Sequence, residues 1–288
     1  MSGAKPGSSE GATPAALAFP GAMLAAFFVV PFGLMIAVSF FQRVQGGFYE
    51  PVLTGANYAR FLSLFFGQIL LFSLGLSALV AALCLLVGAP FTYLLSRLPR
   101  SRQVPWLVAL LAILSLSEVI IGFSWSTLLS RTAGVTNLLV ALGLMGAPTA
   151  LTPSFAAVLL GMSYQAFPYC VLVLYPSFSR LDPALGEAAE TLGASPIRAF
   201  LTVILPALRS TLAATFVVVF VFALGSYLLP QLLGRPQHWT LSVLITDQAI
   251  YQSNMPFAAA MAVFLVLTSL LFVALTALFG RGRREVAS

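Results

Sequence analysis

The sequence predicts an all-α membrane protein with six transmembrane helices. Of its 288 residues, 60% are hydrophobic and only 8% are charged, and the mean hydropathy is +1.00. Because an ordinary soluble domain carries about 25% charged residues, this composition argues against a soluble globular protein and against an enzyme with its own soluble catalytic lobe. The apolar runs are long and continuous, whereas the strands of a membrane barrel would alternate over about 10 residues.

Six apolar runs reach the roughly 20 residues that a spanning helix needs. Proline distorts a helix from within, so we expect the first run to bend at Pro20 or Pro31. The six predicted spans are residues 15–41, 68–95, 105–129, 154–178, 211–233 and 257–279.

Lysine and arginine counts predict the orientation. With the N-terminus inside, about ten of the 14 basic residues fall on inner segments and about four on outer ones. Cytoplasmic segments carry the excess of basic residues, so both termini are expected in the cytoplasm. The organisation is then a disordered tail (1–14), a membrane domain (15–280) and a basic tail (281–288), with a long inner loop at 179–210.

Groups that carry chemistry are scarce. Lys5 is the only lysine and lies in the polar tail, so no nucleotide-binding loop of the form G-x-x-x-x-G-K-[ST] exists; if the protein works by ATP, the ATPase is another chain. His238 is the only histidine, and it cannot form a zinc or haem site with the scattered Cys84 and Cys170. We expect both thiols to be free and buried, and no cofactor in this chain. The net charge of +6 fits basic residues beside spans, not a nucleic-acid partner.

The inner loop predicts a helix-turn-helix. Asp182-Pro183 is typical of a helix start, with a capping residue followed by proline in the first turn. Gly193 favours a turn with positive φ, and Ser195-Pro196 repeats the start signal before a second helix that runs towards Pro206. Small residues on the first helix would let another protein approach its backbone, with Glu187 available to pair with basic groups. An amphipathic linker without a partner is the alternative.

The loop resembles a known family. Glu187-Ala188-Ala189, then Gly193, then Leu205-Pro206 is similar to the EAA loop of binding-protein-dependent ABC importer permeases, E-A-A-x3-G-x9-I-x-L-P, with Val203 in place of the isoleucine. In that family the loop is a coupling helix seated in a groove of the ATPase subunit. The resemblance covers about residues 17–279. It implies a fold like that of type I ABC importer permeases and a coupling role for Glu187, Ala188, Ala189, Gly193, Leu205 and Pro206.

Three further stretches resemble the permeases of polyamine (spermidine/putrescine) importers: 164–176, 224–234 and 254–260. Arg235 and Met255 depart from the usual pattern, which has glycine and an aromatic residue there. The resemblance implies a polyamine or similar small cationic or organic solute. Related permeases carry ferric iron, phosphonates or opine-like amino acids, so these remain alternatives.

The same resemblance implies the partners and the location. The partners are a second, distinct permease, two cytoplasmic ATPases that bind ATP and magnesium, and a periplasmic solute-binding protein. The location is the bacterial inner membrane. A secondary transporter or channel that works alone is the rival of another class, although such carriers tend to hold several ionisable groups at mid-membrane.

Glu118 is the only ionisable residue near the middle of a predicted span. An intramembrane carboxylate usually faces protein or a water-filled cavity, where it would suit a cationic cargo. The alternative is a protonated or hydrogen-bonded group that serves packing, with Ser115, Ser117 or a neighbouring helix as its partner.

Proline and glycine predict irregular backbone in two spans. Gly225 and Pro230 bracket one irregularity in the fifth span, and Pro168 marks another in the fourth. Irregular backbone at membrane depth is tolerated where it lines a cavity or is buried by protein. Plain helix packing is the alternative role for each candidate. In addition to Glu118, the candidate pathway residues are Tyr164, Gln165, Ser226 and Tyr227.

Overall fold

The computed structural model describes residues 14–44 and 47–281. Within these ranges the chain forms helices and no strand beyond one isolated bridge between Gln42 and Glu50. The predictions for the tails at 1–13 and 282–288 fall outside the described residues. In chain order the elements are α1 (Pro14–Leu24), η1 (Ala25–Val29), α2 (Val30–Ser39), α3 (Ala56–Phe61), α4 (Leu64–Arg97), α5 (Arg100–Ser115), α6 (Glu118–Leu128), α7 (Val135–Ala141), α8 (Phe155–Ser179), α9 (Ala184–Thr191), α10 (Pro196–Ala199), η2 (Phe200–Ile204), α11 (Leu205–Ala207), α12 (Arg209–Gly225), α13 (Leu228–Leu233), η3 (Pro236–His238), α14 (Leu241–Thr246), η4 (Asp247–Tyr251) and α15 (Met255–Arg281).

The prediction of six spans is confirmed in number when each bent helix pair counts as one span. Four apolar helices of the described chain are long enough to cross a membrane: Phe19–Ser39, Leu64–Arg97, Phe155–Ser179 and Met255–Ala274. Two further spans are helix pairs, α5 with α6 bent by 98°, and Pro196–Ala207 with α12 bent by 78°. The first span contains a π-helical turn, η1, between Pro20 and Pro31.

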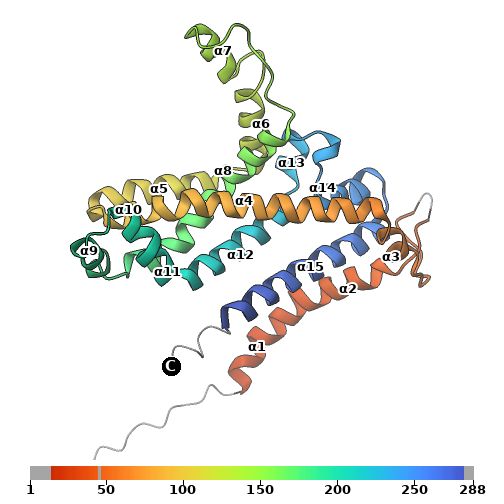
Figure 1. The fold of residues 1–288 in the computed structure, drawn as a ribbon. Coiled ribbons are helices and arrows are strands. Elements are labelled where there is room, and N and C mark those ends of the chain that lie inside the picture. The colour runs from red at the N-terminus through yellow and green to blue at the C-terminus, as the bar shows by residue number, and fades with distance from the viewer. Residues whose placement is uncertain (1–13, 45–46, 282–288) are drawn as a thin grey trace, which may run out of the picture.

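The long helix α4 is the centre of the bundle. It packs against α8 and α12, which also contact each other, and α5 packs on α8 (Figure 1). The turn between α4 and α5 lies at the same end of the bundle as α9 and α10. At the opposite end, α3 and α14 contact α15. The first span pairs with α15 (Figure 1) and its apolar window buries nothing inside the chain, so its surface is left for lipid or another subunit.

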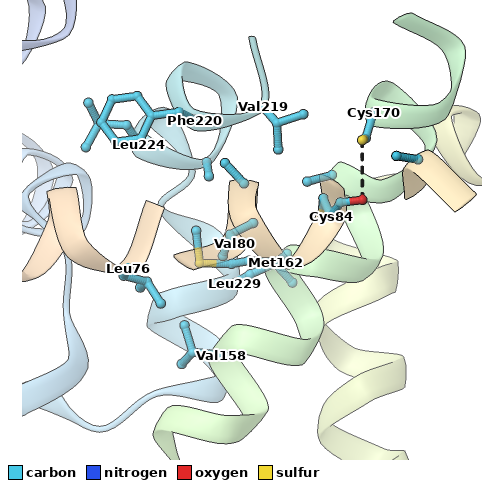
Figure 2. Packing of buried hydrophobic residues seen from close by; sticks show 14 of the residues in the cluster. Leu76, Val80, Cys84, Val158, Met162, Cys170, Val219, Phe220, Leu224 and Leu229 are labelled. Carbon is cyan, nitrogen blue, oxygen red and sulfur yellow. Dashed lines mark hydrogen bonds between the residues drawn. The ribbon is translucent and has the colours of Figure 1, made fainter. Parts of the chain in front are cut away.

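The main core lies where α4, α8, α12 and α13 meet (Figure 2). Val80, Val158 and Phe220 are fully buried there. Cys84 and Cys170 are free and buried, as predicted, and the Cys170 thiol donates to the Cys84 carbonyl oxygen at 3.4 Å (Figure 2). The two thiols therefore act as small packing groups between α4 and α8.

The two predictions of irregular backbone have opposite outcomes. The irregularity predicted between Gly225 and Pro230 is confirmed, because α12 ends at Gly225 and residues 228–233 form the separate helix α13. The irregularity predicted at Pro168 is absent from the described chain, since α8 continues through this residue. Membrane helices tolerate proline when neighbouring groups compensate for the lost hydrogen bond.

Candidate functional site

The first helix of the inner loop, α9, starts and stops as its sequence predicts. The Asp182 carboxylate accepts from the Ala184 N–H at 2.9 Å, and Pro183 already has helical backbone angles. At the other end Gly193 has a φ of +90°. The Ala194 N–H donates to the Ala189 carbonyl at 3.0 Å, and the Gly193 N–H donates to the Glu190 carbonyl at 2.9 Å. These two bonds form a Schellman motif, which holds the turn in one conformation.

The second helix of the loop is continuous with the membrane bundle. Ser195 caps it, its hydroxyl accepting from the Arg198 N–H at 3.4 Å. α10, η2 and α11 then run without a break to Ala207 and meet α12 at the 78° bend. A single run of helical segments therefore joins the turn at Gly193 to the start of α12.

The sequence-predicted coupling residues are mostly exposed. Glu187, Ala188, Gly193 and Pro206 are exposed, while Ala189 and Leu205 are half-buried. Large apolar side chains accompany them, and Leu192 is 89% exposed. An exposed apolar patch of this kind is typical of a surface that binds another protein. Leu185 is the other exposed large apolar side chain of this patch, whereas the exposed Ile197 and Leu201 lie on the second helix and line a groove against α4.

Tyr93 and Gly186, which the sequence reasoning missed, join this loop to the bundle. The Tyr93 ring, on α4, lies 5.2 Å from the Phe200 ring and 6.1 Å from the Phe178 ring, centroid to centroid. Gly186 is buried, and a Cβ added there would lie 3.6 Å from the Tyr93 hydroxyl oxygen. No periodicity marks Tyr93, because its importance comes from three elements that converge on it.

A second candidate region lies where two broken spans meet. Glu118 is the first residue of α6, and it lies beside the 98° bend inside the third span. The Ser226 hydroxyl, just after α12, donates to the Glu118 carboxylate at 2.9 Å. This contact agrees with one of the two alternatives for Glu118, a hydrogen bond to a neighbouring helix.

Polar side chains of the α14 segment stabilise the break after α12. The Ser242 hydroxyl donates to the Leu224 carbonyl at 2.6 Å, and the Thr240 hydroxyl donates to the Ser226 carbonyl at 3.5 Å. Both side chains are buried. Carbonyls freed by a broken helix therefore find partners, as membrane depth requires.

The remaining pathway candidates do not form one cluster with Glu118. Tyr164 packs edge-on against Trp125, with ring centroids 5.6 Å apart, beside a cavity of about 280 Å³. The Gln165 side-chain oxygen is buried and has no hydrogen-bond partner. Tyr227 follows Ser226 directly and is 39% exposed. The structure thus brings together Glu118 and Ser226 and leaves Tyr164 in an apolar wall.

The described residues contain no group of three or more His, Cys, Asp and Glu side chains that could hold a metal ion. Bent spans around one core, with a helical hairpin at one end, form a multi-span membrane domain.

Comparison with known proteins gives the family. The family described as "binding-protein-dependent transport system inner membrane component" matches residues 104–285, more than half of the chain. The chain belongs to this family: it is a multi-pass permease subunit of an ABC importer in the inner membrane, not an enzyme. Permeases of this family work with ATPase partners and with a solute-binding protein.

Relatives and solved structures agree with this assignment. The chain is 29% identical to the spermidine/putrescine transport system permease protein PotB of Haemophilus influenzae, over 86% of each chain. It is also 29% identical to PotB of Escherichia coli K12, over 85% of this chain and 89% of that protein. A bacterial ABC transporter that imports the acidic polysaccharide alginate has the same fold, with a TM-score of 0.75, 19% identity and coverage of 93% and 94%.

Proposed function

We propose that this permease forms half of a solute pathway and is driven by a separate ATPase through residues 187–206. The observation that carries the proposal is the exposed hairpin of α9 and α10, with its fixed turn at Gly193 and its exposed apolar side chains. A hairpin through which a partner protein moves the spans needs an accessible binding surface and a stiff connection to the helical bundle. The Schellman motif and the packing of Tyr93 supply the stiffness.

The proposed partners are a second, distinct permease, two cytoplasmic ATPases and a periplasmic solute-binding protein. ATP and magnesium bind to the ATPases, whose closure pulls the hairpin inward and rocks the spans between outward- and inward-facing states. The orientation that this mechanism needs places the α9 end of the bundle in the cytoplasm. Six arginines at that end support it by the positive-inside rule: Arg97, Arg100, Arg102, Arg180, Arg198 and Arg209.

The proposed substrate is a polyamine or a similar small cationic or organic solute. The names of the PotB relatives and the carboxylate of Glu118 beside two broken spans both support a cation. Ferric iron, phosphonate and opine-like or amino-acid-like solutes are the alternatives within the same class of importer. The rival from another class, a transporter or channel that works alone, predicts transport in vesicles that contain only this chain.

Two glycines provide a matched test of the coupling role. Gly193 has a φ of +90° and Gly143 has a φ of +73°, and a Cβ at either position meets open space. Valine therefore imposes a similar backbone strain at both sites, but only Gly193 lies in the hairpin. In the co-expressed importer, Gly193→Val should lose ATPase co-purification or uptake, whereas Gly143→Val should keep both. Normal assembly and uptake in Gly193→Val and in Glu187→Arg would refute the coupling role.

A further inference from the structure

An apolar groove lies between α4 and the second helix of the hairpin, and solute transport gives it no role. Its volume is about 470 Å³. Six residues of α4 from Leu85 to Leu94 form one wall, and five residues from Pro196 to Leu205 form the other. Tyr93 is the only one of the eleven with a polar side-chain group. The groove is open to its surroundings, since Leu86 is 74% exposed and Leu94 is 66% exposed.

The length of the groove along α4 matches the thickness of the acyl layer of one leaflet. The α4 wall from position 85 to position 94 rises about 14 Å at 1.5 Å per residue. The hydrocarbon core of a bilayer is about 30 Å thick, so this wall is as long as one acyl layer. It ends one helical turn before Arg97, the last residue of α4.

Positive charge lies at one end of the groove. The Arg97 guanidinium carbon is 5.2 Å from the centroid of the Tyr93 ring, which lines the groove. Arg198 follows the groove residue Ile197 directly on the other wall. Neither α4 nor the segment 196–207 contains an acidic residue. A ligand that fits is apolar along its length and anionic at the end near Arg97.

We propose that this groove binds a phospholipid of the cytoplasmic leaflet, with its acidic headgroup at Arg97 and an acyl chain along α4. Arginine and aromatic side chains favour the headgroup level, and basic residues there attract anionic lipids. The assignment of the leaflet rests on the proposed orientation. The bound lipid fills the space between α4 and the arm that leaves the hairpin, so it supports the arm where Leu205 reaches the groove.

The test uses the complete importer in nanodiscs that contain equal amounts of phosphatidylglycerol and phosphatidylcholine, followed by native mass spectrometry of the lipid each complex retains. Wild type should retain phosphatidylglycerol in preference. Arg97→Gln should lower that preference about fivefold, the scale of one basic residue near an anionic surface. Arg100→Gln, a nearby arginine without a contact to the groove, should keep it. Equal lipid preference in the Arg97→Gln and Arg100→Gln complexes would overturn the proposal.

A second pair of variants tests the groove itself. Leu201→Trp places a large ring in the groove, whereas Leu71→Trp places one on the exposed face of α4 outside it. Lipid retention should be lost only in Leu201→Trp. If another subunit fills the groove, Leu94→Cys labelled with a maleimide–benzophenone reagent, whose maleimide adds to the thiol and whose ketone inserts into a nearby C–H bond under light, would crosslink to that subunit, and the proposal fails. Because these measurements report lipid and not uptake, their failure is distinguishable from failure of the coupling role, which Gly193→Val tests.

Discussion

The Ser226 hydroxyl donates a 2.9 Å hydrogen bond to the carboxylate of Glu118, and this bond joins two interruptions of the membrane bundle. Glu118 begins α6 beside the 98° bend of the third span. Ser226 follows the last residue of α12. The bond therefore joins the first residue of one helix to the residue that follows the end of another.

Replacement of Glu118 by glutamine tests whether its charge serves a cationic solute. Glu118→Gln keeps an oxygen that can accept from Ser226 but removes the charge. The initial rate of spermidine uptake into proteoliposomes should fall about tenfold, the scale of a hydrogen bond to a charged group. Glu50→Gln, at an exposed position near the opposite end of the bundle from α9, is the control. Unchanged uptake in Glu118→Gln would leave the residue with a packing role only.

Truncation of Tyr93 should loosen the hairpin. Tyr93→Ala removes the ring that packs against Phe178 and Phe200, and we expect a loss of about 3 kcal/mol in the free energy of unfolding. Tyr93→Phe retains the ring and should lose much less. Thermal unfolding of the purified complex measures both variants. ATP hydrolysis that no longer depends on the binding protein would accompany only the alanine variant, and equal behaviour of the two would contradict this explanation.

The close approach of α4 and α8 at Gly88 predicts a loss of stability that a second substitution, at Cys170, partly restores. A Cβ at Gly88 would lie 2.9 Å from the Cys170 sulfur, so Gly88→Ala should cost about 1–3 kcal/mol through overpacking. Cys170→Ala removes that sulfur, and the double variant should recover part of the loss. Gly75→Ala on the same helix, where a Cβ meets nothing within 4 Å, should cost little. A double-mutant cycle from unfolding experiments would show no coupling if the contact were unimportant.

The hydroxyl of Ser242 should contribute to the stability of the break after α12. Ser242→Ala leaves the buried Leu224 carbonyl without its 2.6 Å donor and should cost about 1–3 kcal/mol. Thr246→Ala provides the control, because the Thr246 hydroxyl bonds to the Ser242 carbonyl within its own helical segment. Chemical denaturation of both variants in detergent tests this. Equal losses of stability would mean that the break needs no external donor.

Local patterns predicted the parts of the fold that depend on neighbours in sequence. Six apolar runs gave the number of spans, and the cap at Asp182, the turn at Gly193 and the cap at Ser195 are all present. These features follow from residue type alone, because a cap or a positive φ requires particular side chains within a few positions. The coupling and pathway roles of the residues stay predictions.

Features that depend on tertiary contacts escaped the sequence. The 98° bend falls after Ser115, where no proline or glycine marks it, and the one local signal is the capping side chain of Ser117. Gly225 and Pro230 did predict the break that lies between them. Pro168 gave a false signal, since α8 continues through it. Composition cannot distinguish these cases, because partners distant in sequence decide whether an exposed carbonyl is satisfied.

The interruption at Ser226 has a mechanical consequence. A continuous helix can swing one half against the other only by breaking several of its own backbone hydrogen bonds within lipid, where each unpaired group costs several kcal/mol. Here the helix is already interrupted, and the hydroxyls of Thr240 and Ser242 donate hydrogen bonds to the carbonyls of Ser226 and Leu224 at the interruption. α12 and α13 are therefore already separate at Ser226, so a change in the angle between them requires no helix to unwind.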